Sequence, residues 1–282
     1  MVDVSVLTEG EIDEVSDTPS IVAHHRGGSA ANVAAVSARL GRPARFVGVR
    51  AADMMGEWMA SELASLGVEA AGPAAMRSGC IVVLVDHLGQ RRFLTDRGDR
   101  PVWTMDPVWL DGAERLHLTG YALCDPTSGD ACEALALEAR RRGVPVSVDP
   151  SSVSVLEAFG VARFIDLLVD LDPDVILPNA DEVRLLTAAI GGRAWVVTTN
   201  GPDPTWVISP NGASVEVAVP PVAILDTTGA GDAFAAGFLA GLDALGAGRD
   251  AWSLDVVAAA ATGGHHAAAR VVGGVGADAW ED

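Results

Sequence analysis

The chain has 282 residues, of which 49% are hydrophobic and 20% charged, so it can bury a sizeable core and is not intrinsically disordered. Its formal net charge is −19, and a surface this acidic disfavours binding to nucleic acids and to anionic membranes. All 19 basic residues are arginine, which excludes enzyme classes that need an active-site lysine, such as Walker-A nucleotide hydrolases, protein kinases and pyridoxal-phosphate enzymes.

The first hundred residues predict a small β-sheet. Val4–Leu7 and Ile21–His25 are strand-like runs. Cys80–Val85 and Gln90–Leu94 flank the turn cluster at 86–89, and this pattern predicts a β-hairpin. We expect these runs to form a small sheet set apart from the rest of the chain. The absence of a linker or repeat indicates that both parts belong to one unit.

From about residue 105 onward, β-branched runs alternate with helical patterns. The predicted strands are Leu116–Leu118, Val146–Val148, Val175–Leu177 and Trp195–Thr198, and the predicted helices between them are 130–142, 153–169 and 181–190. Two Ala-rich helices follow, at 233–245 and 251–272. The alternation is typical of βαβ units, so we expect an α/β fold with a mostly parallel sheet covered on both faces.

Composition also indicates the compartment. Cys80, Cys124 and Cys132 show no Cys-x-x-Cys spacing and are expected to be free thiols in a reducing compartment. The first residues lack the pattern of a signal peptide. The most apolar predicted helix, between Asp232 and Asp243, is shorter than the ~20 residues that a bilayer requires. We therefore expect a cytoplasmic protein without a membrane segment.

One segment carries a chemical signal of its own. In Asp226-Thr-Thr-Gly-Ala-Gly-Asp232, a Gly-rich turn connects a strand to a helix. Gly229 and Gly231 allow successive N–H groups to point into one concavity, which would bind an anion at the helix N-terminus. Asp232 lies beside that concavity and could accept a proton from an attacking hydroxyl, or it could simply cap the helix. A Rossmann motif is excluded, because its third glycine would fall at Phe234.

This segment resembles the second signature of the ribokinase-like (PfkB) carbohydrate kinases. Gly27-Gly28-Ser-Ala-Ala-Asn32, followed by a helix of small residues, resembles their first signature. The stretches Phe46-Val-Gly48, Asn179-Ala-Asp-Glu182 and Thr199-Asn-Gly201 resemble further family motifs, so the resemblance spans nearly the whole chain. It implies a three-layer α/β sandwich with a central, mostly parallel sheet. It also implies a single domain over residues 1–282, with a β-lid formed from about 3–26 and 77–104.

The resemblance also implies roles for individual residues. In the catalytic centre, Asp232 would be the general base, and the Gly229-Ala230-Gly231 turn would stabilise the transferring phosphoryl group. The sugar would be bound by Asp3, Gly27, Gly28 and Asn32. ATP would contact Asn179, Thr199, Gly201 and His265, and Glu182 would organise Mg²⁺ through water. A monovalent cation, K⁺, would lie beside Asp226 and Thr228, which the loop at 273–277 would help to enclose.

The sequence departs from the family at its first residues. The family opens with a buried strand that ends in Gly-Asp, followed a few residues later by a second Asp that binds sugar. Met1-Val2-Asp3 resembles only the end of that pattern. Two explanations stay open: the start of the coding region lies further upstream, or the sheet lacks a strand. A missing strand would leave an open edge or slot in the sheet. Pro204 also replaces a glycine of the nucleotide loop, and proline removes an N–H there.

The function that these observations predict is ATP-dependent transfer of the γ-phosphoryl group to a primary hydroxyl of a small sugar. Two alternatives stay open: a nucleoside kinase on the same scaffold, and a catalytically inactive relic that only binds sugar. The expected cofactors are ATP, Mg²⁺ and K⁺. The expected partners are the small-molecule substrate and a second copy of the chain, bound through the β-lid.

Overall fold

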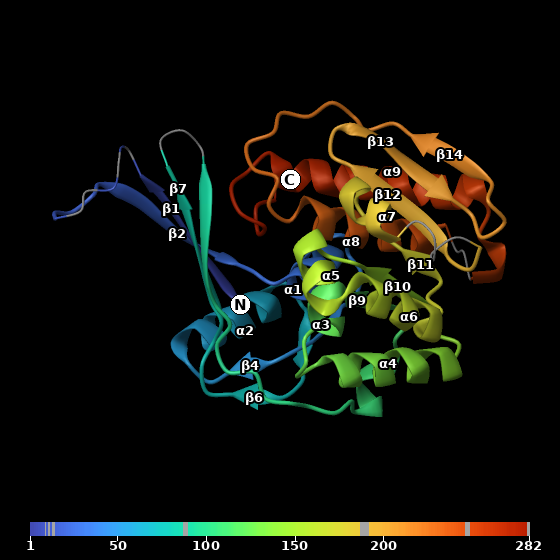
Figure 1. Ribbon diagram of the computed structural model, residues 1–282, viewed down its shortest axis with the longest axis horizontal. Coiled ribbons are helices and arrows are strands. Elements are labelled where there is room, and N and C mark those ends of the chain that lie inside the picture. The colour runs from blue at the N-terminus through green and yellow to red at the C-terminus, as the bar shows by residue number, and fades with distance from the viewer. Residues whose placement is uncertain are drawn as a thin grey trace.

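The protein is described by a computed structural model that covers residues 1–8, 10, 12, 15–86, 90–186, 192–245 and 249–280 (Figure 1). A body of strands and helices forms one side of the molecule, and a narrow β-sheet projects from it at the left of Figure 1. Among the helices within these ranges, none is long and apolar enough to cross a bilayer.

The main sheet of the body has the strand order β14-β13-β12-β11-β10-β9. The strands β9 to β12 are parallel to their neighbours, and β13 and β14 extend the sheet in antiparallel pairs. The bounds are β9 Leu116–Thr119, β10 Val146–Asp149, β11 Val175–Ile176, β12 Trp195–Asn200, β13 Asp203–Ile208 and β14 Ser214–Val217. The four predicted strands coincide with β9 to β12, which confirms the mostly parallel sheet.

Helices cover both faces of this sheet, which makes three layers. Val197 packs with the helices of one face and its neighbour Val196 with those of the other, as expected for a strand buried on both sides. The first face carries α1 Ser29–Arg39, α8 Ala230–Ala244 and α9 Leu254–Val272. The second carries α3 Gly120–Leu123, α4 Gly129–Arg141, α5 Val153–Phe159, α6 Val161–Leu171, α7 Ala180–Leu186 and the 3₁₀ helix η1 Pro107–Leu110.

One predicted helix was wrong in its extent. The helical pattern at 153–169 is divided into α5 and α6 at Gly160, whose φ of 100° is incompatible with a continuous helix. Of the helix predicted at 181–190, α7 accounts for the part up to Leu186, and residues 187–190 lie outside the described residues. A further short 3₁₀ helix, η2 Arg249–Ala251, precedes α9.

The projecting sheet has four strands in the order β2-β1-β7-β8. They are β1 Val2–Thr8, β2 Ser20–Arg26, β7 Cys80–Val85 and β8 Arg91–Asp96. β7 and β8 pair antiparallel, as predicted for the hairpin, although turn residues 87–89 lie outside the described residues. Elements that the sequence did not predict join this sheet to the body: β3 Arg45–Val47, β4 Arg50–Ala51, α2 Met54–Ser65, β5 Glu69–Ala71 and β6 Ala74–Ala75.

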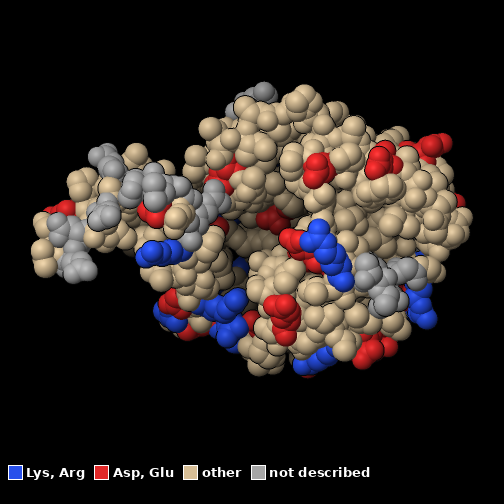
Figure 2. Space-filling model, turned by 45° about the horizontal axis from the view of Figure 1, so that its top comes forward, with Lys and Arg blue, Asp and Glu red and all other residues tan. Residues whose placement is uncertain are grey.

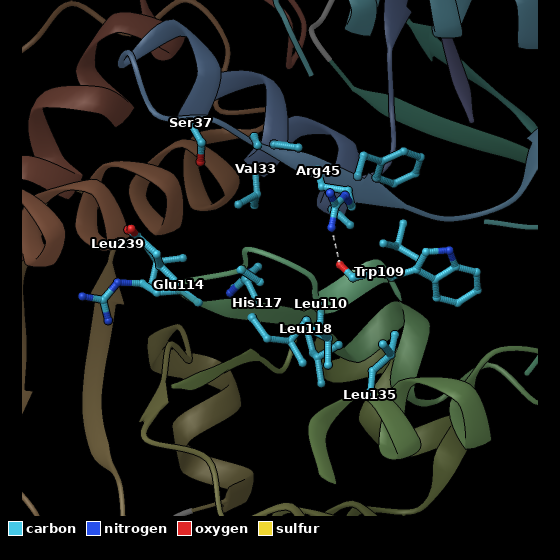
Figure 3. A pocket seen from close by; sticks show the side chains of 18 of the residues that line it. Val33, Ser37, Arg45, Trp109, Leu110, Glu114, His117, Leu118, Leu135 and Leu239 are labelled. Atoms are coloured by element: carbon cyan, nitrogen blue, oxygen red, sulfur yellow. Dashed lines mark hydrogen bonds between the residues drawn. The ribbon is translucent and has the colours of Figure 1, made fainter. Parts of the chain in front are cut away.

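A cavity of about 530 Å³ separates β9, the outer strand of the main sheet, from β3 (Figure 3). Apolar side chains from α1, α4, α8 and β9 line it, among them Val33, Leu135, Leu239 and Leu118. The outer strand β9 of the main sheet therefore presents its open edge to this cavity.

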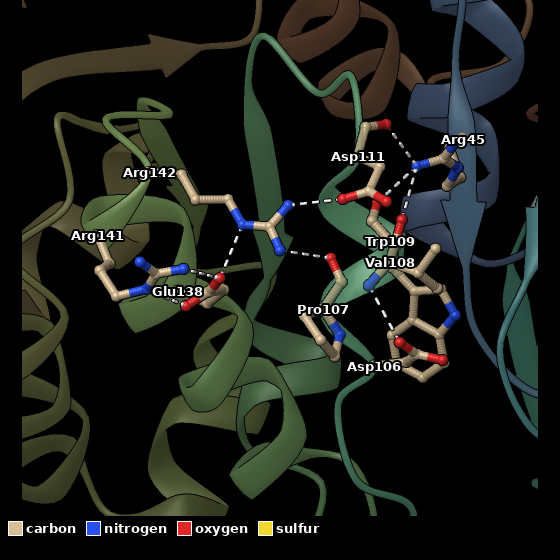
Figure 4. A network of polar contacts seen from close by, with 9 residues as sticks. All are labelled: Arg45, Asp106, Pro107, Val108, Trp109, Asp111, Glu138, Arg141 and Arg142. Carbon is tan, nitrogen blue, oxygen red and sulfur yellow. Dashed lines mark hydrogen bonds and ion pairs between the residues drawn. The ribbon is translucent and has the colours of Figure 1, made fainter.

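Arginine side chains connect the elements around this cavity (Figure 4). The Arg45 guanidinium of β3 donates to the carbonyl oxygens of Trp109 and Asp111 at 2.8 and 3.0 Å. Arg142 pairs with the Asp111 carboxylate at 2.8 Å and with Glu138 of α4 at 2.7 Å. These contacts join β3, the η1 segment and α4 in a region where none of the described strands lies between β3 and β9.

Candidate active site

The Gly-rich turn leads directly into α8. Gly229 is the residue before the helix and has a φ of 78°, and a Cβ atom there would lie 2.7 Å from the Cβ of Ala277. Glycine is therefore required by both the backbone conformation and the close packing. The first amides of a helix have no intrahelical acceptor, so the N–H groups around Gly231 can bind an anion.

Asp232, in the first turn of α8, contacts two residues of α1. One carboxylate oxygen accepts a hydrogen bond from the Ser29 hydroxyl at 2.6 Å, and the other accepts one from Asn32 Nδ2 at 2.9 Å. Asn32 and Asp232 are 200 positions apart in the sequence, so the fold brings the two signature motifs into direct contact. Burial raises the pKa of Asp232 to about 6, although both hydrogen bonds favour its charged form.

The predicted sugar-binding residues lie together at the start of β1 and α1. A Cβ atom on Gly27 would lie 2.2 Å from Asp3 Oδ1, so the carboxyl group occupies the space that a side chain at 27 would fill. Gly28 precedes α1 with a φ of 95°. Asp3 Oδ1 is buried and lacks a hydrogen-bond partner among the described residues. Burial raises the pKa of Asp3, and this carboxyl group in turn raises the pKa of Asp232.

Asn179 and Glu182 form a reciprocal cap at the start of α7. Asn179 Oδ1 accepts from the Glu182 N–H at 2.9 Å, and the two Glu182 oxygens accept from Asn179 N and Nδ2 at 2.9 and 2.7 Å. Glu182 is only 1% exposed, and burial raises its pKa. The helix-cap explanation for this motif is therefore correct as local structure, and a role toward Mg²⁺ stays a prediction.

Asp149, at the carboxyl end of β10, is an acidic residue of this region that sequence reasoning missed. Burial raises its pKa to about 8, with further contributions from Glu182 and Asp232. The sequence did contain a sign of this residue, because Asp149 directly follows the predicted strand Val146–Val148. Ligands bind at the carboxyl ends of parallel strands in open α/β sheets. No group of three or more His, Cys, Asp or Glu side chains suited to a metal occurs in the described part of the chain.

Asp226 holds the Gly-rich turn against the loop that follows α9. One of its oxygens accepts from the Thr228 N–H and hydroxyl at 2.9 and 2.8 Å. The other accepts from the N–H of Gly276 at 3.0 Å. The turn and the loop at 273–277 are therefore adjacent, and Asp226 caps its own turn; the cation site stays a prediction.

The residues predicted to contact ATP lie in two places. Thr199 belongs to β12, and Gly201 occupies the turn to β13 with a φ of 56°. Thr199 also bridges to Asn179, which places these two near each other. His265 is buried between α8 and α9, with its ring centroid 5.1 Å from that of Phe234. Its role toward ATP stays a prediction.

Figure 2 shows a hollow between the projecting four-stranded sheet and the body, with acidic side chains in and beside it. Chemically, the Asp232 region combines a carboxylate whose pKa is raised to about 6 with the Gly-rich turn at the N-terminus of α8 and the buried carboxyl group of Asp3. This set can deprotonate a hydroxyl beside a bound phosphate.

The sequence model described as pfkB family carbohydrate kinase matches residues 1–281. An ATP-dependent ribose-1-phosphate kinase of Halopiger xanaduensis is 33% identical over 76% of this chain and 72% of its own length. A fructokinase of Klebsiella pneumoniae is 31% identical over 86% of this chain and 84% of its own.

Solved structures share the fold. A probable sugar kinase from Rhizobium etli CFN 42 superposes with a TM-score of 0.81 at 21% identity, over 99% of this chain and 92% of the other. A putative ribokinase II from E. coli in complex with ATP and Mg²⁺ gives 0.78 at 21% identity, over 98% and 91%.

Proposed function

Because the chain belongs to the pfkB family of carbohydrate kinases, which are ATP-dependent phosphotransferases, we propose that it transfers the γ-phosphoryl group of ATP to a primary hydroxyl of a small sugar. The observation that carries this proposal is the contact between the two signature motifs. The Asp232 carboxylate is held by Ser29 and Asn32 at the N-terminus of α8, where the Gly-rich turn can bind phosphate. An intact base and turn argue against an inactive relic.

In this proposal, Asp232 accepts the proton of the attacking hydroxyl. Its pKa of about 6 keeps it ionised at neutral pH, yet close enough to the working pH for efficient proton transfer. The amides of the Gly229–Gly231 turn stabilise the negative charge of the transferring group. Backbone amides replace the lysine that many phosphotransferases use, which suits a chain that contains none.

The sugar would be bound on the other side of Asp232. Asp3 has a buried, unpartnered oxygen that can accept a hydrogen bond from a sugar hydroxyl. Gly27 leaves the space for that carboxyl group. Asn32 can both donate and accept, and its Nδ2 already contacts the base. Asp3 and Asn32 would therefore orient the reacting hydroxyl toward Asp232.

Mg²⁺ would be bound near Glu182, whose carboxyl group interacts electrostatically with that of Asp149. Glu182 is the residue that would organise it, with Asn179 holding the carboxylate in place. When bound, Mg²⁺ neutralises the phosphate oxygens of ATP, and it needs few direct protein ligands because it retains water. Thr199 and Gly201 would contact the nucleotide.

We also propose a K⁺ site between Asp226, Thr228 and the loop at 273–277. The hydrogen bond from Gly276 to Asp226 supports it, because it brings the loop to the acidic side chain. Carbonyl groups that turn away from the phosphate as the amides turn toward it would supply further oxygens. Replacing K⁺ by a bulky organic cation in the assay should lower the rate, and an unchanged rate would assign Asp226 a structural role alone.

The projecting sheet would act as a lid over the sugar and as a dimer contact. Several large apolar side chains on it are exposed, including Ile21, Val22, Phe93 and Leu94 at 55–62%. A surface of this kind is typical of protein contacts. Sedimentation should show a dimer that Phe93→Arg converts to a monomer, whereas a monomeric wild type would contradict this part of the proposal.

The function is tested by coupled assay and thermal shift with a panel of sugars and nucleosides. Fructose and ribose 1-phosphate come first, because relatives are named for them. Nucleosides are included because an adenosine kinase from Sinorhizobium meliloti shares the fold. A substrate held at 100 times its Kd should stabilise the protein by about 2.7 kcal/mol. If none of the compounds in a broad panel supports ATP turnover, the result would favour the alternative of an inactive relic that only binds sugar.

A further inference from the structure

Arg26 is a charged residue that the proposed chemistry does not use, and it is almost completely buried. It is the last residue of β2 and is only 1% exposed. A buried charge is costly unless it is paired and hydrogen-bonded. Arg26 has both kinds of partner. Its Nη1 donates to Glu62 of α2 at 2.9 Å, and its Nε donates to Asn32 Oδ1 at 3.3 Å.

The bond to Asn32 determines which way its amide faces. A primary amide has an oxygen that only accepts and a nitrogen that only donates. Because Asn32 Oδ1 faces the Arg26 guanidinium, Nδ2 faces Asp232 and donates to it at 2.9 Å. The opposite orientation would place the amide nitrogen against a guanidinium and the amide oxygen against a carboxylate, so both contacts would become repulsive.

We propose that Arg26 is a positioning residue of the kinase, which orients the Asn32 amide toward the general base and, balanced by Glu62, sets the electrostatic potential at that base. The inference rests on the proposed role of Asp232. It makes Glu62, Arg26, Asn32 and Asp232 one continuous chain of contacts that joins α2, β2, α1 and α8.

Other titratable groups around Asp232 interact with it, and the positive charge of Arg26 acts against those that raise its pKa. Asp3 opposes ionisation of Asp232, and Asp149 and Tyr121 also interact with it electrostatically. Arg26 is the cation that favours its charged form. Glu62 partly neutralises this cation, as does Asp278, whereas Arg39 adds positive charge nearby.

Arg26 and Glu62 should therefore shift the pKa of Asp232 in opposite directions. Removing the cation with Arg26→Met should move the acidic limb of the kcat–pH profile to higher pH, since the positive charge of Arg26 favours the ionised form of Asp232 and its loss raises that pKa. Removing the balancing anion with Glu62→Gln should move the same limb down. Arg26→Lys keeps the charge and should keep the limb close to that of the wild type while lowering kcat.

The experiment measures kcat from pH 5 to 9 at saturating sugar and Mg²⁺–ATP. Arg50→Met, a change at an exposed arginine of β4, is the matched control and should leave the limb in place. If Arg26→Met does not fold, Glu62→Gln still tests the sign of the shift, and Arg26→Lys tests whether the charge alone keeps the limb in place. A limb that stays fixed in folded Arg26→Met and Glu62→Gln proteins would overturn the inference.

The outcome also separates this inference from the proposed function. If Asp232→Asn remains active, the base assignment fails and the role of Arg26 fails with it. If Asp232→Asn is inactive but neither Arg26→Met nor Glu62→Gln moves the acidic limb of the kcat–pH profile, only the inference about Arg26 is overturned.

Discussion

Replacing Asp232 by asparagine should abolish catalysis and, at the same time, stabilise the fold. The substitution removes the proton acceptor but keeps the size of the side chain. A positioned general base contributes about 10²–10⁴-fold to the rate, so kcat should fall by at least that lower value. Nucleotide affinity should change by less than about twofold, because backbone amides, and not the carboxylate, hold the phosphates.

The stability change follows from the pKa of Asp232. Its ordinary value of 3.8 is raised to about 6 by burial, so ionising this carboxyl group in the folded state costs up to about 3 kcal/mol more than in the unfolded chain. The carboxylate is partly exposed, and solvent screening reduces this cost to about 1–2 kcal/mol. Asparagine avoids it, and Ser29 can reverse its hydrogen bond to accept from the new amide. We therefore expect a Tm about 3–6 °C higher at pH 7.

Because the pKa of Asp232 is raised and not lowered, its effect on stability changes within a defined pH range. The folded state holds the proton of Asp232 more tightly than the unfolded state, so the wild type loses stability as the pH rises from about 4 to about 6. The difference in Tm between variant and wild type should grow across this window and then remain constant. Coupled kinase assays measure kcat, nucleotide titration measures the affinity for nucleotide, and thermal unfolding measures Tm. A variant that keeps more than a tenth of wild-type kcat, or that is less stable at pH 7, would refute the reasoning.

Three further substitutions follow from the same geometry. Gly27→Ala inserts a methyl group 2.2 Å from Asp3 Oδ1, so the sugar KM should rise at least about tenfold, and an unchanged KM would separate Asp3 from the substrate. Gly229→Ala, at a φ of 78° in a crowded position, should lower Tm and reduce kcat more than tenfold, whereas Gly231→Ala has open space and serves as the control for folding. Asp149→Asn should abolish the loss of stability that the wild type shows as the pH rises from about 4 to 8, because burial raises the pKa of Asp149 to about 8; parallel Tm–pH curves of variant and wild type would contradict this.

The parts of the fold that the sequence predicted depend on local pattern. The strands β9 to β12 coincide with β-branched runs, because buried parallel strands need continuous apolar residues. Helical periodicity, in contrast, continued through Gly160 and gave no sign of the break between α5 and α6. The two- and three-residue strands β3 to β6 were also missed, since their pairing is set by distant segments.

The residues of the candidate site also fall into two groups, those that a local sequence pattern indicates and those that only the packing brings together. Asp232, Gly229 and Asn32 were predicted because each lies in a short stretch that resembles a signature of the family, and two such signatures occur in the expected order. Arg26 was not, because the strand pattern before Gly27 does not show that its last side chain turns inward. Its burial depends on Glu62, which α2 supplies from 36 positions further along the chain. Interactions of this kind arise from packing and leave no local pattern.

The cavity between β3 and β9 leads to one more prediction, about the edge of the main sheet. Leu116 N–H donates to Pro145 O on the β10 side at 2.9 Å, and successive residues of a strand point their N–H groups to opposite sides. The amides of His117 and Thr119 therefore face the cavity, whereas that of Leu118 faces β10. An unpaired edge exchanges its amide hydrogens readily, so those of His117 and Thr119 should exchange at least about tenfold faster than those of Leu116 and Leu118 in native-state NMR measurements. Equal protection of all four amides would show that a further segment or molecule pairs with this edge in solution.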